Sequence, residues 1–137
     1  DNLRHGLCSD LSFDFEDRHE NKRRVAEVSK LMIDAGLIII TSFISPFEKD
    51  RALAKEIIGE QNFIEVYCNS FLDICEKRDV KGLYKKARQG LIPNFTGIDS
   101  PYEKPINPDL SIDTSLISVE ESVRVIVKFL QEQQYIK

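Results

Sequence analysis

The opening segment DNLRHGL places a carboxylate, an amide and a guanidinium within four residues, shortly before a glycine. Arg4 could bind a phosphate or a sulfate through two parallel hydrogen bonds, and Asp1 could accept the proton of a hydroxyl group. The plain alternative is a solvated ion pair near a chain end. Taken alone, the segment indicates a candidate anion site and nothing more specific.

A second group of polar residues lies at the start of an expected helix. Arg18 and Asn21 stand three positions apart, so on a helix they share one face and could reach one ligand together. An exposed polar face is the alternative. Phe13 and Phe15 precede this helix, where an aromatic ring either stacks on a base or packs against the start of the helix.

Two serines follow an apolar run that we expect to be a strand. Ser42 and Ser45 fall where that strand ends, the side of an open parallel sheet on which ligands bind. A serine hydroxyl at this position could donate to a phosphate, be phosphorylated itself, or only cap the helix that follows Pro46.

A basic stretch between two glycines, Gly82 and Gly90, stands out in an acidic chain. A glycine-hinged basic loop indicates closure over a multiply charged anion. Its basic residues are Arg78, Lys81, Lys85, Lys86 and Arg88.

A second loop aromatic, Phe95, follows Asn94. Together with Phe13 it could hold a purine between two rings while the basic loop binds the anionic tail. The 137 residues contain no G-x-x-x-x-G-K-[ST] pattern and no Gly-x-Gly pair. By pattern alone, no phosphate-binding glycine loop is visible in the sequence.

Helical and strand patterns alternate along the chain, which predicts a three-layer α/β domain with a mostly parallel sheet. About thirty residues between Arg78 and Pro108 lack the pattern apart from one short basic helix, as in a lid or binding loop. We expect Ser70 to cap the helix that it precedes. The expected helices span 17–35, 47–58, 70–77 and 119–133, and the expected strands span 37–43, 63–68 and 110–112.

Length and composition fit one globular domain. With 137 residues, 42% hydrophobic and 31% charged, the chain is not a disordered tail, a collagen-like fibre or a disulfide-rich miniprotein. No apolar run approaches the roughly 20 residues that cross a bilayer. A net charge of −4 argues against binding nucleic acid through bulk charge. Three cysteines and two histidines without a C-x-x-C pair favour reduced thiols in the cytoplasm over a zinc site.

Taken together, the motifs resemble the adenylyl-sulfate kinase (APS kinase) family over essentially the whole chain. That family consists of P-loop kinases, which transfer the γ-phosphoryl group of ATP to the 3′-hydroxyl of adenosine 5′-phosphosulfate (adenylyl sulfate) in sulfate assimilation. The blocks that carry the resemblance are DNLRHGL (1–7), DRHENKRRVAEV (17–28), ITSFISPF (40–47), RDVKGLYKKAR (78–88) and FTGIDSPYE (95–103).

The resemblance implies a role for each matching position. Asp1 matches a candidate base. Ser45 matches a serine described in the family as a phosphoserine intermediate. We discount that role in favour of a ligand contact, because P-loop kinases usually act by direct in-line transfer. Lys81 and its basic neighbours Arg78, Lys85, Lys86 and Arg88 match a lid at the nucleotides. The implied adenylyl-sulfate contacts are Asn2, Arg4, Phe13, Arg18, Asn21, Ile44, Ser45, Lys81, Asn94 and Phe95. The sequence departs from the family pattern at Cys8-Ser9 and Ser12.

The resemblance also implies a strand, a phosphate loop and a helix ahead of the D-N-x-R block. We therefore expect 1–137 to be a kinase domain trimmed at its N-terminus, with a lid at about 78–108. The alternatives are a noncatalytic adenylyl-sulfate-binding module, the kinase part of a bifunctional enzyme fused to a sulfurylase, and a kinase for another nucleoside. A G-x-x-x-x-G-K-[ST] motif upstream of Asp1 would favour the kinase over the binding module.

The implied cofactors are ATP and Mg²⁺, with no metal ligand assigned to this chain. The implied partners are the two nucleotides and a second copy of the chain in a homodimer, with an associated or fused ATP sulfurylase as a further expectation. No nucleic acid or membrane partner is expected.

Overall fold

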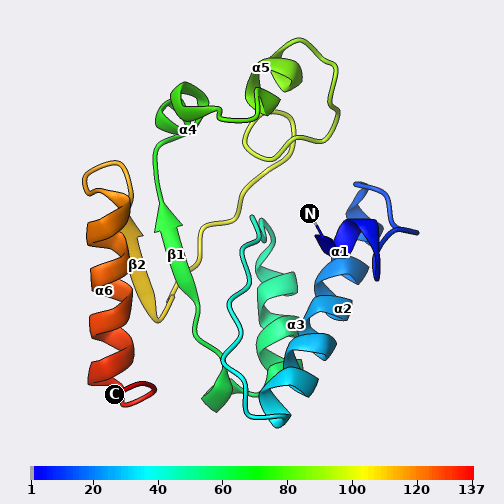
Figure 1. The fold of residues 1–137 in the computed structure, drawn as a ribbon. Helices are drawn as coiled ribbons and strands as arrows, with labels where there is room; N and C mark the ends of the chain where they lie inside the picture. The colour runs from blue at the N-terminus through cyan, green and yellow to red at the C-terminus, as the bar shows by residue number, and fades with distance from the viewer. Residues whose placement is uncertain (1) are drawn as a thin grey trace. The chain divides into compact units, whose positions relative to one another are not determined.

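The computed structural model describes residues 2–137, which divide into two compact units (Figure 1). The first unit runs to Phe63 and includes Asn94–Lys104. The second unit comprises Ile64–Pro93 and Pro105–Lys137. Asp1 lies outside the described residues.

The first unit is built on two packed helices, α2 (Phe15–Asp34) and α3 (Glu48–Ile58), with the short helices α1 (Asn2–His5) and η1 (Glu60–Asn62). Asp14 caps α2, because its carboxylate accepts the N–H of Asp17 at 2.9 Å. The rings of Phe15 and Phe47 meet edge to face with centroids 5.1 Å apart. Both long helices fall where the sequence predicts them, within two residues.

The apolar face of α2 is only partly buried. Val25 and Ala26 are buried, as the helical periodicity predicts for Val25. Leu31 is 69% exposed and Met32 is exposed as well, so these two apolar side chains of α2 lie outside the core. Among the described helices of the first unit, α3 alone packs extensively against α2, and one partner helix covers only part of the apolar stripe of α2.

The segment 37–43 is not a strand, so the prediction of a strand there is wrong. Residues 37–46 form no helix or strand, and Ile38 and Ile40 are 70% and 89% exposed. A strand is defined by hydrogen bonds to a neighbouring strand, and among the described residues none lies beside this segment. The β-branched composition alone does not provide that partner.

The second unit contains a parallel pair of strands, β1 (Val66–Asn69) and β2 (Leu110–Asp113), in which Val66 lies opposite Leu110. The predicted parallel pairing is confirmed. β1 begins three residues later than the pattern indicates. Ile112 of β2 is 3% exposed and belongs to the core of this unit.

Three helices accompany these strands: α4 (Leu72–Arg78), α5 (Leu83–Arg88) and α6 (Val119–Glu132). Ser118 and Glu121 form a capping box at the start of α6. Ser70 does not cap α4, contrary to the prediction, because α4 begins after Phe71 and has no side-chain cap. No helix in the described part of the chain is long and apolar enough to cross a membrane.

Candidate functional site

Arg4 and Phe13 form a stacked pair in the first unit. The guanidinium carbon of Arg4 lies 4.4 Å from the centre of the Phe13 ring, and its Nη1 donates to the carbonyl groups of Leu11 (3.2 Å) and Ser12 (2.6 Å). The Phe13 side chain is nevertheless 65% exposed. The pair therefore presents a positive charge beside an accessible aromatic surface.

Arg18 joins two loops that are far apart in the sequence. Its Nε donates to the carbonyl of Phe13 at 2.7 Å, and its Nη2 donates to the carbonyl of Asn94 at 2.6 Å. Nη1 donates to the hydroxyl of Thr96 at 3.3 Å. The structure thus brings Arg4, Phe13, Arg18 and Asn94 together, as the predicted site requires.

The loop that begins at Asn94 is held by a carboxylate that the sequence prediction missed. Asp99 accepts the N–H of Asn94 at 2.8 Å and also that of Phe95. Asn94 has a φ of 56°, in the left-handed region that asparagine tolerates better than most residues. These amides lie five and four residues before Asp99, unlike the forward contact of an Asx turn, so no local turn pattern indicates Asp99.

Asn21 is the most unusual polar side chain of the first unit. It is 1% exposed, and its Nδ2 finds no hydrogen-bond partner among the described residues. An unpaired buried donor costs about 1–3 kcal/mol, so such groups are rare unless a ligand satisfies them. Asn21 lies one helical turn after Arg18 on α2.

Ser45 lies near the end of residues 37–46, the segment between α2 and α3 without regular structure, and has a φ of 43°. Its carbonyl accepts a hydrogen bond from Nη1 of Arg51 at 2.8 Å, and the residue lines a cavity of about 80 Å³ together with Lys22 and Asp50. Ile44, beside it, is 65% exposed.

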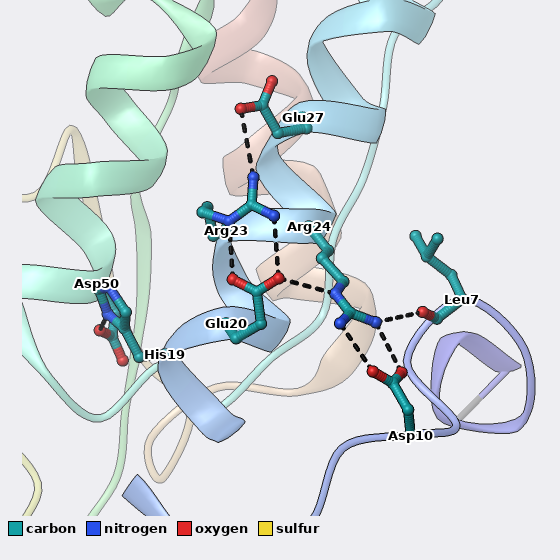
Figure 2. Close-up of polar contacts among 8 residues, drawn as sticks. All are labelled: Leu7, Asp10, His19, Glu20, Arg23, Arg24, Glu27 and Asp50. Carbon is teal, nitrogen blue, oxygen red and sulfur yellow. Dashed lines mark hydrogen bonds and ion pairs between the residues drawn. The ribbon is translucent and has the colours of Figure 1, made fainter. Parts of the chain in front are cut away.

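The ionisable side chains that line the same cavity are Lys22, Asp50 and Arg51. Nδ1 of His19 lies 2.6 Å from Oδ1 of Asp50, which is almost fully buried (Figure 2). Burial lowers the pKa of Lys22 to about 8, and the Asp50 carboxylate opposes that shift. The Lys22 ammonium lies 4.5 Å from the centre of the Phe43 ring.

A chain of ion pairs on α2 holds the loop that carries Phe13 (Figure 2). Arg24 binds Asp10 through two hydrogen bonds of 2.7 and 2.8 Å, the carbonyl of Leu7 at 2.8 Å and Glu20 at 2.9 Å. Hydrogen bonds from Arg23 and Arg24 lower the pKa of Glu20 to about 2. These contacts fix the loop after α1 against the helix that supplies Arg18.

The basic residues predicted for the lid belong to the second unit. Arg78 donates to the carbonyl and hydroxyl of Thr114, and Arg88 forms a two-pronged pair with Glu76. Asp79 accepts the N–H groups of Tyr84 and Lys85, both at 3.0 Å, at the start of α5. The side chains of the other basic residues are exposed, namely Lys81, Lys85 and Lys86.

Two predicted site residues remain, Asn2 and Asp1. Asn2 begins α1 and is exposed, while Asp1, the candidate base, lies outside the described residues. Within residues 2–137 no group of three or more His, Cys, Asp or Glu side chains could hold a metal ion.

Parallel strands connected through helices define the chain as an α/β protein, in which Arg18 joins the loops that carry Phe13 and Asn94. The family model for adenylylsulphate kinase matches residues 1–113, and the chain belongs to that family, whose fold is that of a P-loop kinase. It is accordingly a phosphotransferase with an alcohol acceptor, which confirms the enzyme class predicted from the sequence.

Individual relatives agree with this assignment. The chain is 57% identical to an adenylyl-sulfate kinase of Oceanobacillus iheyensis, over 99% of this chain and 68% of the relative. It is 54% identical to an adenylyl-sulfate kinase of Prochlorococcus marinus, over 100% of this chain and 68% of the relative. The Mycobacterium tuberculosis APS kinase CysC in complex with AMPPNP and APS superposes with a TM-score of 0.90 at 45% identity, over 95% of this chain and 76% of that one.

Proposed function

We propose that the first unit holds the acceptor substrate of an adenylyl-sulfate kinase, which transfers the γ-phosphoryl group of ATP to the 3′-hydroxyl of adenosine 5′-phosphosulfate. The products are ADP and 3′-phosphoadenylyl sulfate. The observation that carries the proposal is the contact of Arg18 with both the Phe13 loop and the Asn94 loop. The solved relative in complex with an ATP analogue and APS supports the same pair of substrates.

The base of the substrate is proposed to lie against Phe13 and Phe95. Arg4 stacks on the Phe13 ring, and the ring is still 65% exposed, so aromatic surface remains for a base. Phe95 follows Asn94 directly, in the loop that Arg18 and Asp99 hold in place. Stacking on an aromatic ring does not distinguish one base from another, so hydrogen bonds must supply the specificity for adenine.

The anionic part of the substrate is proposed to be bound by Arg4 and Arg18, whose guanidinium groups suit phosphate and sulfate oxygens. Asn21 would donate from its unpaired Nδ2 to an acceptor atom of the bound nucleotide. These groups are held before the substrate arrives, so their orientation costs little at the moment of reaction.

Ser45 is proposed to contact the ligand through its backbone and hydroxyl, together with Ile44, and not to form a phosphoserine. Arg51 holds the Ser45 carbonyl, and the positive φ turns the chain directly into α3. Such a fixed turn suits a positioning role, and direct in-line transfer needs no covalent intermediate.

Residues 78–108 are proposed to form the lid, with Lys81, Lys85 and Lys86 adding positive charge near the transferring phosphoryl group. In the second unit Arg78 and Arg88 are engaged by Thr114 and Glu76, so these two arginines would shape the lid.

ATP is the proposed phosphoryl donor. Mg²⁺, when bound to ATP, would neutralise charge on the phosphates, and we assign it no ligand in residues 2–137. The three free cysteines support a location in the reducing cytoplasm. The homodimer and an association with ATP sulfurylase stay predictions.

The proposal is tested by equilibrium binding of adenylyl sulfate and of adenosine 5′-phosphate to the protein, measured by calorimetry. Two arginines facing the phosphosulfate should make adenylyl sulfate bind at least about tenfold more tightly. Equal affinities would contradict the assigned role of Arg4 and Arg18. Binding of adenylyl sulfate without turnover in the presence of ATP and Mg²⁺ would favour a noncatalytic binding module.

A further inference from the structure

Helix α3 begins without a cap from its own sequence. Its N-cap residue is Phe47, which has no side chain able to accept a hydrogen bond. The first N–H of the helix, that of Glu48, instead donates to Oε2 of Glu103 at 2.6 Å, from a residue 55 positions later in the chain. Glu103 thus caps α3 from a distant segment.

The contact between the two segments also runs in the opposite direction. The backbone N–H of Glu103 donates to the carbonyl of Pro46 at 2.8 Å. Two hydrogen bonds therefore hold residues 46–48 against Glu103, directly after Ser45. Arg51 holds the carbonyl of Ser45 itself. A carboxylate is also the favourable charge at a helix N-terminus, where the backbone amides carry partial positive charge.

The segment that supplies Glu103 is fixed at its other end by the candidate site. Asn94 and Thr96 accept hydrogen bonds from Arg18 of α2. Residues 94–104 all belong to the first unit, and we call them the strap. The strap is bound to the start of α2 through Arg18 and to the start of α3 through Glu103. It therefore links the Phe13 and Arg18 contacts with the Ile44 and Ser45 contacts, in addition to the direct packing of α2 on α3.

We infer that Glu103 is a positioning residue of the acceptor site: it holds the strap on α3 and so fixes Phe95 relative to Ser45. The inference rests on the proposed function. We assign Glu103 no role in binding ATP, and it need not touch the substrate. Loss of its carboxylate should loosen the adenylyl-sulfate site selectively, because the strap would lose its side-chain bond to the start of α3 and keep there the weaker hold of the backbone bond to Pro46.

The test compares variants of the intact enzyme by steady-state kinetics. Glu103→Ala should raise the KM for adenylyl sulfate at least about fivefold and change the KM for ATP less than about twofold. Glu103→Gln keeps an oxygen acceptor of the same reach, so it should restore most of the affinity. Glu103→Asp keeps the charge but is one methylene shorter, so it should raise the KM for adenylyl sulfate as Glu103→Ala does. If the alanine variant does not fold, the KM values of Glu103→Asp test the inference.

The matched control is Ser118→Ala, which removes the cap of α6 in the second unit. It should lower the melting temperature by about as much as Glu103→Ala and leave both KM values unchanged. Faster hydrogen exchange at the Glu48 amide in Glu103→Ala, but not in Glu103→Gln, would support the cap directly.

Three outcomes overturn the inference. In the first, Glu103→Ala and Glu103→Asp lose stability but keep the KM for adenylyl sulfate, so that Glu103 is only a helix cap. In the second, the KM values for adenylyl sulfate and ATP rise together. In the third, the wild-type enzyme neither binds nor phosphorylates adenylyl sulfate, which overturns the proposed function along with the inference, whereas in the first two outcomes the proposed function stands.

Discussion

Arg18 and Asn94 lie 76 positions apart and are joined by a hydrogen bond of 2.6 Å from the Arg18 guanidinium to the Asn94 carbonyl. The same guanidinium reaches the carbonyl of Phe13 and the hydroxyl of Thr96. One planar group with several donors therefore connects a helix and two loops. In the proposed site these loops carry the two aromatic rings, so the geometry of the base-binding region depends on this arginine.

Replacing Arg18 by lysine should impair adenylyl-sulfate binding although the charge is kept. A lysine ammonium is a compact point charge and cannot serve the carbonyls of Phe13 and Asn94 in the same fork geometry. We expect Arg18→Lys to raise the KM for adenylyl sulfate at least about tenfold, measured by steady-state kinetics. Arg124→Lys in α6 is the control and should have no effect. A wild-type KM in Arg18→Lys would show that charge alone is needed.

Phe95→Ala should raise the KM for adenylyl sulfate strongly. Stacking of a base on an aromatic ring is worth about 1–3 kcal/mol, which corresponds to a loss of about 5- to 150-fold in affinity. Phe71→Ala removes a ring that is 70% exposed in the second unit and serves as the control. An unchanged KM in Phe95→Ala would remove Phe95 from the site.

Asn94 allows the backbone and the side chain to be tested separately. Its φ of 56° disfavours alanine by about 1–2 kcal/mol, whereas glycine adopts this conformation readily. We expect Asn94→Ala to lower the free energy of unfolding by about 1 kcal/mol and Asn94→Gly to lower it less, as measured by urea denaturation. If glycine also restores adenylyl-sulfate binding, the site needs the Asn94 backbone. Equal destabilisation by both changes would contradict the argument from φ.

Lys22 should make stability depend on pH in the alkaline range. Burial lowers its pKa from 10.5 to about 8, so between these values the unfolded chain binds more protons than the folded one, and the free energy of unfolding rises with pH. Lys22→Met removes the cost of burying the charge. We expect it to raise the free energy of unfolding by about 2 kcal/mol at neutral pH and by less near pH 10.

The control for this prediction is Lys30→Met, which changes an exposed lysine of the same helix. It should leave the pH dependence as in the wild type. A loss of stability in Lys22→Met that is the same at both pH values would mean that the contact of Lys22 with Phe43 outweighs desolvation.

The helices of the fold could be predicted because their signals are local. The cap at Asp14, the capping box at Ser118 and the left-handed glycine that follows α2, Gly36, all lie within a few residues of the helix ends that they define. The strand predicted at 37–43 fails for the opposite reason. Its apolar residues indicate a strand only if other strands pair with them, and periodicity cannot show that.

The residues of the candidate site, like the elements of the fold, include some that the sequence indicates and others that it does not. The resemblance to a family places Arg4, Phe13, Arg18 and Asn94 in one predicted site, and the structure brings these four residues together, while their roles in binding stay predictions. Thr96, Asp99 and Glu103 act on the loops through hydrogen bonds whose partners cannot be read from the pattern alone, so the sequence prediction missed them. The 55-residue separation between Glu48 and Glu103 is the clearest case.

The most direct test of the account is product formation by the intact enzyme from ATP, Mg²⁺ and adenylyl sulfate, followed by ³¹P NMR, for the wild type and for Arg18→Ala. The account predicts equal amounts of ADP and 3′-phosphoadenylyl sulfate from the wild type. For Arg18→Ala it predicts a raised KM for adenylyl sulfate and an unchanged KM for ATP. No phosphorylation of the 3′-hydroxyl by the wild type, or a variant whose KM rises for ATP alone, would contradict it.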